Sequence, residues 1–140
     1  RPLQRKVRDI MWKYCGVVRS GDGLIIGLKE LEKVRKASNE VDVRPSAEGY
    51  IDLALALDLL GSIESAEATM KSALLRKESR GAHQRTDYPD LSDEEIVNYL
   101  VELEKGEQKT STRKVKPVRD DLMEPLSKFS DLGVDGRLLE

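Results

Sequence analysis

The sequence predicts a mainly α-helical protein: a three-helix bundle, spectrin-repeat-like, with a small C-terminal β-hairpin. Apolar residues recur at steps of three and four in three separate segments of the first 80 residues. Aromatic residues are only 4% of the chain and charged residues 36%, which suits helices with an aliphatic core and solvated outer faces. A length of 140 residues fits one domain. We expect the bundle over residues 1–90, a short helical turn plus the hairpin packed on it over 91–118, and a loosely ordered tail over 119–140.

The first helix is predicted over residues 3–18. Pro2 stands in the first turn, where its missing N–H has no intrahelical partner to lose. The outer face is basic, with Arg5, Lys6, Arg8 and Lys13. The apolar positions that define the inner stripe are Leu3, Val7, Ile10, Met11, Tyr14 and Val18.

A break at residues 20–23 separates this segment from a second predicted helix. The apolar positions of that helix are Leu24, Ile25, Leu28, Leu31 and Val34. The stretch from Gly21 to Gly27 approximates the glycine-rich dinucleotide fingerprint, with one residue too many before the third glycine. A helix rather than a strand is predicted before it, so we interpret the stretch as a turn between helices.

The third helix is predicted from about residue 47 to residue 80, a stretch without proline. Gly61 suggests a bend, and Gly81 follows a basic last turn, the combination expected at a left-handed helix cap. A helix of this length needs a mate, which the first two helices together could supply. The predicted buried stripe consists of Leu53, Leu57, Leu60, Ile63, Met70 and Leu74.

After Pro89 the pattern changes from helical to extended. The sequence Ser92 to Glu95 has the form of a capping box and predicts one or two helical turns. Residues 99–118 then alternate in polarity around Lys105-Gly106-Glu107, which predicts the β-hairpin. An isolated hairpin is marginally stable in water, so we expect it to lie on the helices or on a partner surface.

The charge balance limits the classes of partner. The chain has 24 basic and 26 acidic residues, a net charge of −2, so no overall field gathers polyanions. The basic face of the first helix and the basic residues of 109–119 could contact phosphates. We interpret both as solvated faces that the acidic stretch 90–107 complements, and we predict no nucleic-acid partner.

The single cysteine and the absence of long apolar runs indicate the compartment. Cys15 can form no internal disulfide, and we expect a buried, inert thiol. No apolar run approaches the roughly 20 residues that span a bilayer, so we expect no direct membrane insertion and a cytoplasmic location.

A cluster of hydrogen-bonding side chains follows the third predicted helix: Arg80, His83, Arg85 and Asp87. His83 is the only histidine, without a second His or paired Cys, so we expect no metal site. Catalysis would need an orienting partner and a pocket, which a bundle of this size does not suggest. We predict that the cluster is an interface; the alternative is that it ties its loop to its own bundle. No catalytic, cofactor-binding or metal residue is assigned.

Two sequence elements resemble one family. The first is Met11-Trp-Lys-Tyr-Cys-Gly-Val-Val-Arg19. The second is Arg-Lys-Glu-Ser-Arg-Gly-Ala-His, residues 76–83, together with the residues that follow it up to Pro89. Residues 3–90 resemble the C-terminal domain of the flavoprotein subunit of succinate dehydrogenase and fumarate reductase. L-aspartate oxidase shares both elements and is the alternative. The Gly-Ala-His form and the hairpin favour the dehydrogenase, although the family's Trp and His after Pro89 are replaced by residues 91–98.

The resemblance implies a helical domain appended to flavin-binding and capping domains of the same chain, with FAD and the succinate–fumarate chemistry in those absent parts. None of the family's residues that bind FAD or act on the dicarboxylate maps onto this sequence. The implied partners are those domains and an iron–sulfur subunit, with the parent peripheral on the inner face of the membrane through partner subunits. The start at Arg1 without methionine suggests a domain excised from a larger flavoprotein. A free-standing helical interaction module is the remaining alternative.

Overall fold

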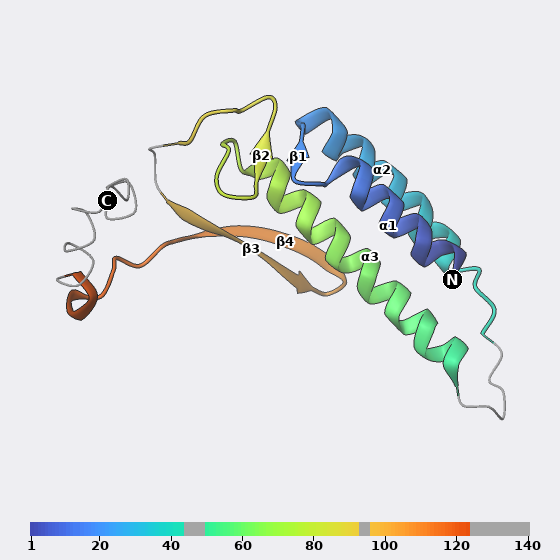
Figure 1. Cartoon of the computed structure of the whole chain (residues 1–140). Coiled ribbons are helices and arrows are strands. Elements are labelled where there is room, and N and C mark those ends of the chain that lie inside the picture. Colours follow the sequence, from blue (N-terminus) through green and yellow to red (C-terminus); the bar gives the residue numbers. More distant parts are fainter. Residues whose placement is uncertain (44–49, 93–95, 124–140) are drawn as a thin grey trace.

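A computed structural model describes residues 1–43, 50–92 and 96–123. The chain is mainly helical and carries a small antiparallel β-hairpin, as predicted. Helices α1 (Pro2–Tyr14), α2 (Gly21–Ser38) and α3 (Ile51–Leu75) run alongside one another and contact pairwise (Figure 1). None of the helices in the described ranges is long and apolar enough to cross a membrane. The predicted helical turn at 92–95, the predicted start of the third helix and most of the tail 119–140 lie outside the described residues; residues 120–123 are helical.

The core is aliphatic and lies between the three helices. Its most deeply buried large side chains are Leu24, Leu31, Val34, Ile63 and Met70, and α1 contributes Val7 and Ile10. Gly27 on α2 lies where α2 packs tightly against α1 and α3. A Cβ at this position would lie 2.7 Å from Met70 Cε and 2.9 Å from Tyr14 Cβ. A side chain at residue 27 would therefore push apart helices that otherwise interlock.

The buried stripe of α3 differs from the predicted one. Leu53, Leu57 and Leu60 were predicted to be buried, but their side chains are 42%, 60% and 46% exposed. Ile63 and Met70 are buried as predicted, and Leu74 packs on the core from its edge. The first ten residues of α3 are apolar on nearly every side, so spacing alone could not choose the inner line. The residues that form it follow steps of four and three: Leu59, Ile63, Ala66, Met70 and Ala73.

Two helix boundaries at the α1–α2 junction also differ from the prediction. α1 ends at Tyr14, and Val18, predicted on its apolar stripe, is 65% exposed in the short strand β1 (Val18–Arg19). α2 begins at Gly21, so the glycines lie inside the helix and not in a turn before it. The reason is the N-cap Ser20, whose Oγ accepts a hydrogen bond from the Gly23 N–H at 3.1 Å.

α3 ends at Leu75, five residues before its predicted end, and continues through Gly61 as a single helix (Figure 1). Gly81 is therefore not a helix cap. It has a φ of +56° in a tight reverse turn, in which the backbones of Arg80 and His83 exchange hydrogen bonds of 2.8 and 2.9 Å. Glycine favours this left-handed φ in a turn as much as at a helix end, and the sequence does not distinguish the two.

The hairpin consists of β3 (Val97–Glu104) and β4 (Glu107–Lys114), with Glu104 opposite Glu107. Its two-residue turn, Lys105-Gly106, has φ values of +52° and +85°, as a type I′ turn requires. β4 ends at Lys114, short of the predicted Val118. The hairpin lies against α3 (Figure 1), where Gln108 Nε2 donates to both the carbonyl and the carboxylate of Glu64 at 2.8 Å.

A candidate interface at the end of the third helix

The candidate residues lie in the loop that follows α3, and this loop returns to the α1–α2 junction. Its strand β2 (Gln84–Arg85) pairs in parallel with β1, with Val18 opposite Gln84 and Arg19 opposite Arg85. The flanking backbone bonds run from Gln84 N–H to the Val17 carbonyl at 3.1 Å and from Thr86 N–H to the Arg19 carbonyl at 2.9 Å. This pairing holds the Arg85 side chain beneath the end of α3.

Arg85 caps the C-terminus of α3. Its side chain is almost completely buried, and Nη1 donates to the carbonyls of Ala73 at 2.8 Å, Leu74 at 3.2 Å and Arg76 at 3.1 Å. The last carbonyls of a helix have no intrahelical N–H partner and carry partial negative charge. The buried guanidinium donates hydrogen bonds to these carbonyls and places a positive charge beside their partial negative charge.

Asp87 connects Arg85 to the N-terminus of α2. Its carboxylate accepts from Arg85 Nε at 2.7 Å and Nη2 at 2.6 Å, and its Oδ2 also accepts from the Gly21 N–H at 3.1 Å. Hydrogen bonds from Arg85 and the Gly21 amide hold the pKa of Asp87 well below its usual range. The pair places a cation at one helix C-terminus and an anion at one helix N-terminus, the orientation that both helix dipoles favour.

A second network surrounds Glu78, which the sequence analysis did not single out. Its buried carboxylate accepts from Arg76, from Arg80 Nε at 3.1 Å and from the Ser92 N–H at 3.2 Å. Burial alone would raise the pKa of Glu78, but these hydrogen bonds bring it below its ordinary value. The sequence does contain a signal for this network, because Glu78 is an acidic residue inside the otherwise basic segment 76–80.

Ser79, beside Glu78, fixes the same loop. Its Oγ accepts from the Arg85 N–H at 2.8 Å and donates to the Tyr88 carbonyl at 2.8 Å, and its N–H donates to the Asp90 carbonyl at 2.9 Å. Ser79 is buried, so these bonds satisfy polar groups that water does not reach.

His83 is partly buried at the edge of the loop. Its Nε2 lies 3.4 Å from the Arg76 carbonyl oxygen. Burial lowers the pKa of His83, and the nearby positive charges of Arg19, Arg76 and Arg85 lower it further. No carboxylate among the described residues contacts the ring, so this arrangement lacks the orienting acid of a general base. Among the described residues, no group of three or more His, Cys, Asp or Glu side chains could hold a metal ion.

The four predicted interface residues therefore make contacts mainly within this chain. Arg85 and Asp87 form one internal pair, Arg80 joins Glu78 and donates through Nη2 to the Ser92 carbonyl at 3.0 Å, and His83 faces Arg76. These contacts favour the alternative that the loop is tied to its own helices, most clearly for Arg85 and Asp87. Docking by Arg80 and His83 stays a prediction.

The glycine stretch at the start of α2 does not fit a dinucleotide. The N–H of Gly21 is bound by Asp87 and that of Gly23 by Ser20, so the amides that would hold a phosphate already have acceptors within the chain. The predicted charge complementarity is found in part. Glu104 of the acidic stretch pairs with Lys109 of the basic segment 109–119, whereas no described ion pair joins the basic face of α1 to residues 90–92 or 96–107.

Comparison with known families identifies this domain. The model of the fumarate reductase flavoprotein C-terminus matches residues 4–129. The chain belongs to this family. The flavoprotein C-terminal domain is 35% identical over 100 residues to the succinate dehydrogenase flavoprotein subunit of Rickettsia bellii, and 43% identical over 89 residues to the L-aspartate oxidase of Pyrococcus furiosus. These alignments cover 71% and 64% of this chain but only 17% and 14% of the relatives, so the chain spans less than a fifth of either.

Solved structures share the fold of this flavoprotein C-terminal domain. The quinol fumarate reductase of E. coli superposes with a TM-score of 0.77 at 23% identity, over 84% of this chain and 21% of that one. The Sdh1 complex of Mycobacterium smegmatis gives 0.79 at 21% identity, over 99% of this chain and 25% of that one. The adenylylsulfate reductase of Archaeoglobus fulgidus gives 0.70 at 24% identity, over 84% of this chain and 19% of that one. At these identities the likeness concerns the fold alone.

Proposed function

We propose that the chain is the non-catalytic C-terminal domain of a longer FAD-dependent oxidoreductase that interconverts succinate and fumarate. The family match over residues 4–129 carries this proposal. The relatives are five or more times longer than the matched segment, so FAD and the dicarboxylate are assigned to the remainder of the protein. The internal use of Arg85 and Asp87, and of the amides at the start of α2, supports a structural role for this part.

The three helices are proposed to act as a spectrin-repeat-like bundle that supports the flavin-binding and capping domains. Leu53, Leu57 and Leu60 support this role, since they lie at helical spacing near one side of α3 and are 42–60% exposed. Large apolar side chains gathered on one face commonly mark an interaction surface. We assign this face to contact with the preceding domains of the same polypeptide.

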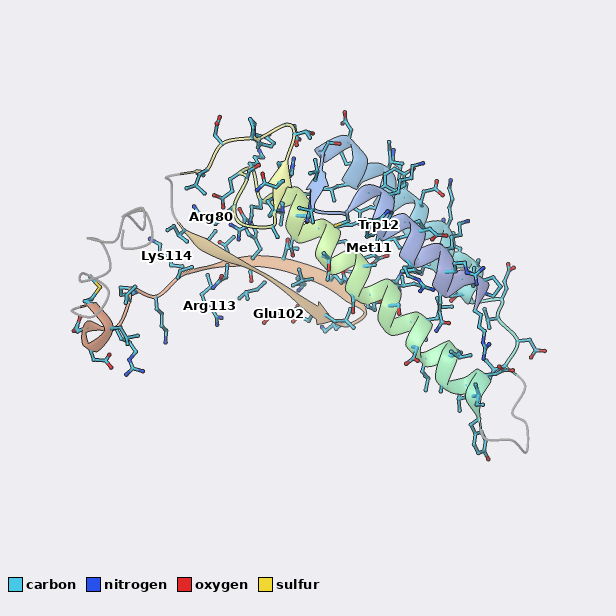
Figure 2. All side chains as sticks on the ribbon, viewed as in Figure 1. Met11, Trp12, Arg80, Glu102, Arg113 and Lys114 are labelled. Atoms are coloured by element: carbon cyan, nitrogen blue, oxygen red, sulfur yellow. The ribbon has the colours of Figure 1, made fainter. Side chains whose placement is uncertain are left out.

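The edge formed by Arg80 and His83 is proposed to contact an iron–sulfur subunit, with the parent held at the inner face of the membrane through its partner subunits. Both side chains are partly exposed at one end of the helices, and Figure 2 places Arg80 in the loop beside β3. Arg85 and Asp87 would then act indirectly, because their pairing holds the loop that presents Arg80 and His83.

Co-purification from the longer protein tests the interface. Arg80→Ala and His83→Ala are expected to reduce recovery of the iron–sulfur subunit while flavin content stays unchanged. Arg113→Ala, an exposed arginine on β4, is the matched control and should retain the subunit. If both loop variants assemble normally but unfold at lower denaturant concentration, the loop is internal scaffolding only.

L-aspartate oxidation is the second candidate for the parent's activity. The identity of 43% to the P. furiosus L-aspartate oxidase over 89 residues favours it. The two candidates separate when the purified longer protein receives succinate or L-aspartate with an artificial electron acceptor. Reduction with succinate alone supports the dehydrogenase assignment, and reduction with L-aspartate alone overturns it.

A further inference from the structure

A hollow of about 470 Å³ is lined by residues of α3, β3, β1 and the loop after α3. Its charged or titratable lining groups are Arg19, Arg76, His83 and Tyr99, with neutral polar groups such as Ser72 and Asn98 beside them. Among the described residues, no acidic side chain lines it. We call it the Arg19 pocket.

Arg19 is the arginine of this pocket whose charge has no counterpart. Its side chain is partly buried and forms no ion pair among the described residues. Nη1 lies 3.9 Å from Cys15 Sγ and Nη2 3.5 Å from the Ala82 carbonyl, both long contacts. Its Nε is buried and has no hydrogen-bond partner within the described structure. A buried donor without an acceptor is rare in native proteins.

The other arginines around the pocket are satisfied by this chain's own groups. Arg76 pairs with Glu78, donates to the Val97 carbonyl at 2.9 Å and lies over the Tyr99 ring. Arg85 is paired with Asp87. Each of these guanidinium groups has a carboxylate partner, whereas Arg19 has none in the part of the chain that the structure describes.

We propose that the Arg19 pocket binds a carboxylate group. The two Nη groups of the planar Arg19 guanidinium are held only by long contacts, and together they suit the two oxygens of a carboxylate. The carboxylate could belong to a free small anion or to a protein segment that packs on this face, and the chemistry of recognition is the same. This proposal does not depend on the flavoprotein assignment, because it rests on the pocket alone.

His83 reports occupancy of the pocket. Its ring lines the hollow beside Tyr99 of β3, and burial together with the positive charges of Arg19, Arg76 and Arg85 lowers the pKa of His83. A bound carboxylate offsets part of this positive charge, so it raises the pKa of His83 and binds more tightly as the pH falls.

The pKa of His83 can be read without ambiguity, because the chain has one histidine. NMR titrations of the 140-residue chain in acetate and in chloride at equal ionic strength should show a saturable upward shift in acetate. The shift should vanish in Arg19→Met and shrink in Arg19→Lys, which keeps the charge but loses the Nε–H. Arg5→Met, on the exposed face of α1, should behave as the unmodified chain. Thermal melts of each variant confirm that the fold is retained, and a stronger effect of inorganic phosphate than of acetate would contradict the carboxylate assignment.

The longer protein distinguishes the two sources. There, the pH dependence of His83 acylation by diethyl pyrocarbonate, followed by peptide mass spectrometry, gives the same pKa. A value above that of the isolated chain, insensitive to added acetate, identifies a carboxylate supplied by the protein. A value equal to that of the chain and raised by acetate identifies an open site for a free anion. The proposal is overturned if acetate has no effect on the chain and the longer protein gives an unshifted, insensitive value.

Discussion

Replacing Arg85 by methionine should be the most destabilising substitution in the loop after α3. Methionine keeps much of the aliphatic volume but removes the guanidinium, which donates to three carbonyls at the end of α3 and twice to Asp87. Arg85 is 3% exposed, so water cannot take over these bonds without opening the loop.

The expected loss follows from the number of groups left without a partner. Removing one member of a buried ion pair typically costs about 3–5 kcal/mol. The Asp87 side chain is 38% exposed and regains water, which moves the estimate to the lower end. The bond to the Ala73 carbonyl is buried and those to the Leu74 and Arg76 carbonyls are partly buried, so these groups regain less water than Asp87 does. We therefore expect a loss of about 3–4 kcal/mol in the free energy of unfolding.

Urea unfolding followed by far-UV circular dichroism measures this loss, with the slope checked for two-state behaviour. Arg113→Met, on the hairpin (Figure 2), is the matched control and should change the stability by less than about 0.5 kcal/mol. Arg85→Lys should fall between the two, because lysine keeps the charge but cannot reach the carbonyls and Asp87 together. A loss below about 1 kcal/mol for Arg85→Met would refute the view that this side chain joins the ends of α2 and α3.

Three further predictions concern packing and pH. Ile63→Ala should lower the free energy of unfolding by about 2–5 kcal/mol, because the Ile63 side chain is fully buried. Leu57 is 60% exposed, so Leu57→Ala should lower it by less than about 1 kcal/mol. Equal shifts in the denaturant midpoints of the two variants would mean that the inner face of α3 is wrongly placed. Gly27→Ala should lower the free energy of unfolding by about 1–3 kcal/mol through overpacking. Gly61→Ala should raise it by about 0.5–1 kcal/mol in the same assay, because nothing lies within 4 Å of the added Cβ. Higher stability in both variants would contradict the close packing of the helices at Gly27. The pKa of Asp87 is lowered on folding, so its contribution to stability is complete above its unfolded pKa of about 4 and is lost as the pH falls below that value. In thermal melts between pH 2 and 7, Asp87→Asn should therefore reduce the loss of stability at acid pH. An unchanged loss would argue against the pairing of Asp87 with Arg85.

The sequence predicted the helices, the hairpin and most of the core, since these depend on periodicity within one segment. The turn at Lys105-Gly106 was foreseeable because a two-residue hairpin turn needs positive φ values, which glycine adopts readily, and Gly106 is present in the sequence. Residues 51–60 were ambiguous, since leucines on several sides of the helix allow more than one stripe. Of the leucines in this segment, only Leu59 is buried. Further along α3 the buried line includes Ala66 and Ala73, whose small side chains permit close helix contact.

The candidate site was predictable as a cluster but not as a set of contacts. The proximity of Arg85 and Asp87 in sequence suggested a polar site. The groups that satisfy them lie elsewhere: the Gly21 amide is 66 residues from Asp87, and the Ala73 carbonyl at the end of α3 is 12 residues from Arg85. The β1–β2 pairing that brings these segments together involves two residues on each side, too few to show as a pattern. For the same reason the lack of an acceptor for Arg19 Nε could only be found in three dimensions.

Flavin content and substrate oxidation in the longer polypeptide, measured beside the isolated chain, test the central claim most directly. We expect the longer protein to bind FAD and to reduce an artificial acceptor with succinate, whereas residues 1–140 alone should bind no flavin and show no activity. Stoichiometric flavin bound to the isolated chain, or a longer protein that lacks flavin, would contradict the assignment of this chain as the non-catalytic C-terminal domain of a flavoprotein.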